Sequence, residues 1–189
     1  MPAILLAQPT VEPLTLAEAK AFLRVEHADD DGLIAALIAA ARSHVENATR
    51  CALITQRWRL SLDSWPDNGL IDVRPGPLQA LAAARVYDEA GVTRDLDTQA
   101  FLADCAANVI AFAPSALPRP GRVAAGIALE VVCGYGDTAA AVPEPLRQAV
   151  RLLVAHWYEN RGLVAIGHET ALLPQTVAAL LAPFRLVSL

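Results

Sequence analysis

Residues 33–63, LIAALIAAARSHVENATRCALITQRWRLSLD, contain the change of pattern that decides the fold class. In the first part Ile34, Ile38 and Val45 recur at the spacing of one helical face. From Gln56 onward the pattern has a period of two, because apolar and polar side chains alternate as in a half-buried strand. A long helix is therefore followed by a β region, which predicts an α+β fold.

Four helices are expected along the chain. Thr15 can cap a first helix that extends to Val25, and Glu18 can complete a capping box. Asp29 or Asp30 can cap the second helix, which continues to about residue 50. A third helix is expected over residues 143–161, and a fourth from about residue 174 to just before Pro183. We expect these helices to form the core of the protein, which is therefore predicted to be mainly helical.

The middle of the chain has the pattern of short strands separated by turns. Strands are expected over residues 56–63, 70–73, 83–87, 92–94 and 123–132, with a hairpin turn at residues 88–91. Residues 114–120, which hold three prolines, are expected to form an extended loop. We therefore expect one domain over residues 1–189, with helical parts 1–55 and 142–189. Residues 56–136 are the expected β-rich insertion, a hairpin or small antiparallel sheet.

Composition narrows the class of protein. A chain of 189 residues with 54% hydrophobic and 19% charged residues can bury a core and is not of the disordered type. Its longest apolar run, residues 33–41, is too short to span a bilayer, so no membrane partner is expected. The net charge of −5 disfavours broad, sequence-independent binding of nucleic acid. Three cysteines without metal-ligand spacing, and a start without a basic segment, predict a protein made in the cytoplasm.

No motif in the sequence predicts catalysis, a cofactor or a metal. The pattern GYGDTA at residues 134–139 resembles a dinucleotide loop, but the prolines after it delay the helix that such a site needs. The run DDDG at residues 29–32 lacks calcium ligands at the required positions and is interpreted as helix capping. His156 and Glu159 lack the partners of a metal centre. We therefore predict no catalytic, cofactor-binding or metal-binding residues.

Two pairs of arginines and one group of four alanines remain as candidates for contact surfaces. Arg57 with Arg59, and Arg147 with Arg151, could meet phosphate, or could be solvated or paired with acids such as Glu144. Four alanines at positions 35, 36, 39 and 40 make one flank of the second helix smooth. Such a flank admits another helix at close range.

Eight short sequence segments along the chain, taken together, resemble the head-tail connector (adaptor) proteins of long-tailed phages and of alphaproteobacterial gene transfer agents. They lie at residues 14–25, 29–38, 58–66, 118–123, 126–136, 142–148, 156–161 and 180–185. The resemblance implies a structural protein that forms a dodecamer-like ring beneath the portal of the particle and extends the DNA channel. The implied partners are other copies of the chain, the portal protein and a downstream stopper or tail protein. DNA would pass through the channel without sequence-specific binding.

The resemblance also implies a role for the C-terminal segment. In related adaptors this segment docks onto the portal, so we assign portal docking to Phe184, Arg185, Leu186, Val187 and Leu189 as a hypothesis. The same residues could instead cover the core of their own chain. Two other functions stay open: a stopper or tail-completion protein of the same particle, and a small enzyme whose site is assembled from distant residues.

Overall fold

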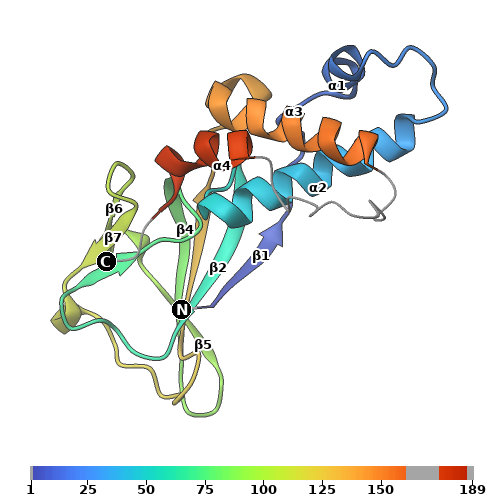
Figure 1. The fold of residues 1–189 in the computed structure, drawn as a ribbon. Coiled ribbons are helices and arrows are strands. Elements are labelled where there is room, and N and C mark those ends of the chain that lie inside the picture. Colours follow the sequence, from blue (N-terminus) through green and yellow to red (C-terminus); the bar gives the residue numbers. More distant parts are fainter. Residues whose placement is uncertain (1, 161–174, 187–189) are drawn as a thin grey trace, which may run out of the picture. The chain divides into compact units, whose positions relative to one another are not determined.

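The computed structural model describes residues 2–160 and 175–186 and shows a mixed α+β fold (Figure 1). The chain forms two compact units, each built from two stretches of sequence. The sheet unit combines residues up to Pro9 with Thr55–Tyr135. The helical unit combines Thr10–Ile54 with the described residues from Gly136 onward.

The helical unit contains the four expected helices: α1 (Leu16–Leu23), α2 (Asp31–Thr49), α3 (Glu144–Glu159) and α4 (Gln175–Leu181). The capping box is confirmed, since the Glu18 backbone N–H donates to Thr15 Oγ1 and the Thr15 backbone N–H donates to the Glu18 carboxylate. Asp30 occupies the N-cap position of α2, as expected, but makes no side-chain bond to the helix backbone. Its carboxylate accepts the Tyr158 hydroxyl instead.

The core of the helical unit follows from the helical spacing of its apolar residues. On α2 the buried side chains fall three or four positions apart, so they form one face. On α3 the buried residues fall in groups at 146, 149–150 and 153–154, about one helical turn apart, and also form one face. The buried apolar side chains of α2, α3 and α4 are Ile34, Ile38, Ala41, Val45, Leu146, Ala149, Val150, Leu153, Val154, Val177 and Leu181. Burial of these faces, more than helix propensity, stabilises helices of this length.

The sheet unit contains two antiparallel sheets. The larger has the order β1-β2-β8-β4-β5, with β1 at Ala3–Ala7, β2 at Gln56–Leu62, β8 at Ile127–Cys133, β4 at Leu78–Tyr87 and β5 at Thr93–Leu96. The smaller has the order β3-β7-β6, with β3 at Leu70–Asp72, β7 at Val109–Phe112 and β6 at Phe101–Asp104. Short 3₁₀ turns η1 to η4 lie at Thr98–Ala100, Pro114–Ala116, Ala139–Ala141 and Ala182–Phe184. The expected hairpin is β4–β5, with Gly91 at φ +81° in its turn.

Two expectations about the fold need correction. The core is not mainly helical, because the sheet unit has a buried core of its own around Leu60, Leu129 and Val131. Residues 1–55 are not wholly helical either, because Ala3–Ala7 forms strand β1, which pairs with β2. The β part is thus a five-stranded and a three-stranded sheet and not a single small insertion.

Candidate assembly surfaces

The predicted docking segment is tied to its own helical unit where the structure describes it. The Leu186 backbone N–H donates to the Thr49 carbonyl at 3.0 Å. The Cys51 thiol donates to the Phe184 carbonyl, with 3.4 Å between sulfur and oxygen. Phe184 and Leu186 are half-buried, whereas Arg185 is exposed. Val187 and Leu189 lie outside the described residues.

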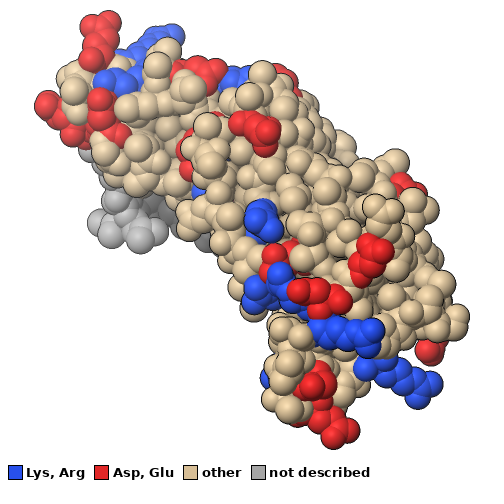
Figure 2. Space-filling model, turned by 180° about the vertical axis from the view of Figure 1, so that it is seen from behind, with Lys and Arg blue, Asp and Glu red and all other residues tan. Residues whose placement is uncertain are grey.

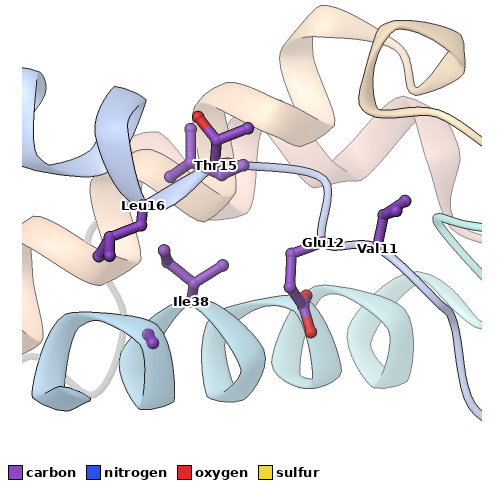
Figure 3. Close-up of a pocket in the computed structure, with 7 residues that line it drawn as sticks. Val11, Glu12, Thr15, Leu16 and Ile38 are labelled. Atoms are coloured by element: carbon purple, nitrogen blue, oxygen red, sulfur yellow. The ribbon is translucent and has the colours of Figure 1, made fainter. Parts of the chain in front are cut away.

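The alanine flank of α2 is on the surface and borders an apolar cavity of about 250 Å³. Ala35, Ala36 and Ala40 are exposed. The cavity lies between α2 and the segment that leads into α1, and the side chains of Leu16 and Ile38 extend into it (Figure 3). Its wall is apolar apart from Glu12 and Thr15, which suits packing against another apolar surface better than binding a polar ligand.

Both arginines that were singled out on α3 are held by acids. Arg147 contacts Glu18 at 2.7 Å and Glu144 at 3.1 Å, and it also donates to the Pro13 carbonyl. Arg151 pairs with Glu144. The hydrogen bond from Arg151 lowers the pKa of Glu144, and the hydrogen bond from the Thr15 backbone lowers that of Glu18. The structure therefore confirms, for these two arginines, the alternative in which they are paired with acids.

The arginines on β2 belong to a cluster around Glu130 of β8. Glu130 is directly opposite Arg59 in the register, and its side chain is only 10% exposed. Arg85 of β4 contacts the same carboxylate at 2.6 Å, Arg59 contacts it at 3.0 Å, and Arg57 contacts it at 3.4 Å. Burial raises the pKa of Glu130, but the hydrogen bonds from Arg85 and Arg59 outweigh it and lower the pKa overall. Glu130 is thus a carboxylate that neutralises part of a basic sheet face.

The Glu130 cluster was not predicted, although the sequence carries a signal for it. Glu130 is the only charged residue in the apolar run of β8, and a buried acid requires basic partners. Nothing in the sequence identifies Arg85 as one of these partners, because it lies 45 positions away. Strand β1 was also missed.

Charges of both signs are mixed on the surface. Figure 2 shows basic side chains beside acidic ones on the face turned away from the viewer in Figure 1. Arg85 illustrates the pattern, since it also pairs with Asp95 of β5 at 2.9 Å.

The structure also shows where the remaining candidates from the sequence lie. The loop at residues 134–139 is a turn after β8, since α3 begins only at Glu144. His156 Nδ1 lies 3.4 Å from the side-chain nitrogen of Asn160. In residues 2–160 and 175–186, His, Cys, Asp and Glu side chains do not gather in a group of three that could hold a metal ion. None of the helices in those residues has the length and apolar character needed to cross a membrane.

Comparison with known proteins confirms the resemblance stated from the sequence. Residues 13–91, which span α1, α2 and β2 to β4, match the family model of phage gp6-like head-tail connector proteins. No curated protein matches the chain in sequence.

Solved structures extend the likeness to the whole chain. A chain in the neck of an empty gene transfer agent (GTA) particle, computed with C6 symmetry, has 27% identity and a TM-score of 0.82. A chain in the virion of a native GTA particle has 26% identity and a TM-score of 0.83. A chain in the neck of a native GTA particle, computed with C12 symmetry, has 26% identity and a TM-score of 0.78. Each match covers 100% of this chain and 97% of the other.

Proposed function

We propose that this chain, which resembles head-tail connector proteins in sequence and in fold, is one copy of a ring between the portal and the tail of a phage or gene transfer agent particle. The observation that carries the proposal is the full-length likeness to chains from GTA necks, at 27% identity and a TM-score of 0.82. A local motif could be shared by unrelated folds, whereas this likeness includes both units of the chain. The ring would extend the DNA channel of the portal.

A ring needs surfaces through which copies of the chain contact one another. Necks computed with C6 and C12 symmetry contain chains similar to this one. Cyclic symmetry requires two different surfaces on each copy, since each subunit contacts its neighbours head to tail. The alanine flank of α2 and the cavity beside it offer one apolar surface of this kind. We propose a ring of about twelve copies.

The charge distribution suits a channel through which DNA slides. The chain has a net charge of −5, and Arg57, Arg59 and Arg85 share the carboxylate of Glu130. Binding that is independent of sequence increases with the number of phosphates that free Lys and Arg side chains neutralise. The acidic net charge therefore suits passage of DNA without sequence-specific binding.

The C-terminal segment is the proposed portal contact. Arg185 is exposed and can reach a partner, while Phe184 and Leu186 are half-buried. The bond from the Leu186 backbone N–H to the Thr49 carbonyl holds this part of the segment against the end of α2. The downstream stopper or tail protein would contact another surface of the ring.

The role proposed is structural and not enzymatic. The chain's apolar cavity has one acid in its wall, Glu12, and this carboxylate is held by Arg42 at 2.8 Å. Burial raises the pKa of the Cys133 thiol to about 12, which keeps it from acting as a thiolate nucleophile near neutral pH. These features favour packing over chemistry.

The experiment is electron microscopy of the purified chain mixed with the portal protein encoded near it. We expect an added layer on one end of the portal, with rotational symmetry. A variant that lacks residues 184–189 should fold but add no layer. Full-length chain that adds no layer at any salt concentration would contradict the proposed function. A layer formed equally well by the deletion variant would contradict only the docking role of the C-terminal segment.

A further inference from the structure

Strand β1 is an open, apolar edge of the five-stranded sheet. All five of its residues, Ala3–Ala7, are exposed, and Ile4 is 56% exposed. In the part of the chain that the structure describes, β1 pairs with β2 on one side and with no strand on the other. The strand contains no charged or polar side chain. An uncovered edge of this composition is a template for pairing with another strand.

The register identifies the backbone groups on the open side. The Ser61 backbone N–H donates to the Pro2 carbonyl at 3.1 Å, so Pro2 and Ser61 face each other as a hydrogen-bonded pair. Such pairs alternate along an antiparallel ladder, so Ile4, which is opposite Arg59, also directs its N–H and C=O toward β2. Ala3 and Leu5 lie between these positions and direct their N–H and C=O groups outward.

The opposite edge of the same sheet carries charged side chains, which β1 lacks. Strand β5 carries Arg94 and Asp95, and Asp95 forms an ion pair with Arg85. Charges on an edge strand discourage pairing with other chains. The prolines near β1, Pro2 and Pro9, lie outside the strand and leave its outward donors in place.

We propose that the outer edge of β1 pairs with a strand or extended segment of a second copy of this chain. The inference rests on the proposed ring and identifies one of its contact surfaces. The occupant is a second copy because chains similar to this one occur in necks computed with C6 and C12 symmetry, and cyclic symmetry repeats a chain around one axis. A neutral, apolar edge also lacks the charge that would select nucleic acid or an acidic peptide. Ile4 and Leu6 would supply apolar contacts beside the backbone bonds.

Two variants test the edge through different groups. Leu5→Pro removes an outward N–H that β2 does not use, so it should block pairing and leave the β1–β2 ladder in place. Ile4→Glu adds a charge to the edge and keeps the backbone intact, and its carboxylate would lie opposite Arg59. The matched control is Leu102→Lys, which changes an apolar residue that is 70% exposed on the smaller sheet.

The assay is sedimentation velocity of each protein, alone and with the portal, with circular dichroism and thermal unfolding as the test of folding. We expect the wild type and Leu102→Lys to assemble to the same size, and both β1 variants to self-associate at least about tenfold more weakly. Hydrogen exchange should show the amides of Ala3 and Leu5 protected in the assembled wild type and unprotected in the monomer.

Each alternative result has a distinct meaning. Folded β1 variants that assemble like the wild type would overturn the inference and leave the proposed ring intact. Variants that form normal rings but no longer bind the portal would assign the edge to the portal and overturn pairing between copies. A wild-type chain that assembles neither alone nor on the portal would overturn the proposed function, and the inference with it.

Discussion

Replacement of Glu130 by Gln tests how the sheet unit tolerates three arginines on one face. The substitution keeps the size of the side chain and removes the charge that Arg85, Arg59 and Arg57 share. Breaking a fully buried pair costs about 3–5 kcal/mol, and an exposed pair contributes about 0–1 kcal/mol. Glu130 is 10% exposed but its arginines are 31–52% exposed, so the case lies between these limits. We expect the free energy of unfolding to fall by about 2 kcal/mol.

The pH dependence provides an independent check on the same residue. The pKa of Glu130 is lowered in the folded protein, so its carboxylate stabilises the fold fully above the unfolded pKa of about 4.3. This stabilisation is lost as the pH falls through the folded pKa. The difference between wild type and Glu130→Gln should therefore be largest near neutral pH and shrink in acid.

Urea unfolding, followed by circular dichroism and tryptophan fluorescence, measures the effect. Asp95→Asn is the matched control, because Asp95 pairs with the same Arg85 but its side chain is 82% exposed. The control should change the free energy of unfolding by less than about 0.5 kcal/mol. A loss below about 0.5 kcal/mol for Glu130→Gln, or a loss that does not change with pH, would refute the argument.

Three further predictions concern stability and reactivity. Thr15→Ala removes the capping box of α1 and should lower the free energy of unfolding by about 1 kcal/mol, measured by urea unfolding; no change would mean that the cap is redundant. Leu129→Ala opens a cavity in the core of the sheet unit, where Leu129 is fully buried, and should cost about 2–5 kcal/mol in the same assay; a cost below about 1 kcal/mol would contradict the packing described. A thiol reagent near pH 8 should modify Cys105, which is exposed, faster than Cys51 and Cys133, which are buried, as mass spectrometry can measure; equal rates in the folded protein would contradict their burial.

The helices could be predicted because their signals are local. The Thr15–Glu18 capping box and the spacing of Ile34, Ile38 and Val45 lie within single helices, and each forms as expected. Strands β2, β3, β5 and β8, and the second half of β4, were also found from alternation and turn residues. The hairpin between β4 and β5 was identified from residues 88–91, which form its turn.

Strand β1 was missed because its pattern is not local. The five residues Ala3–Ala7 are all apolar, so they do not alternate as a half-buried strand does. Their pairing partner, β2, begins about 50 positions later, and only the register reveals the contact. The α+β fold class was predicted correctly, but residues 1–55 were expected to be helical because the N-terminal segment was counted with the helices.

The candidate surfaces were predictable only in part, for a similar reason. The pairing of Arg147 and Arg151 with Glu144 was open to prediction because the three residues share one helix. The cluster of Arg85 with Glu130 depends on the register of three strands, which no local pattern fixes. The bond between Leu186 and Thr49 likewise joins distant parts of the chain, so its sequence could not reveal how the C-terminal segment begins.

The central claim is that the chain joins the head of a particle to its tail. The most direct test is deletion of its gene in the bacterium that encodes the particle, followed by electron microscopy of the particles that form. We expect heads filled with DNA that lack tails, and tailed particles when the gene is restored from a plasmid. Tailed particles of normal appearance in the deletion strain would contradict the account.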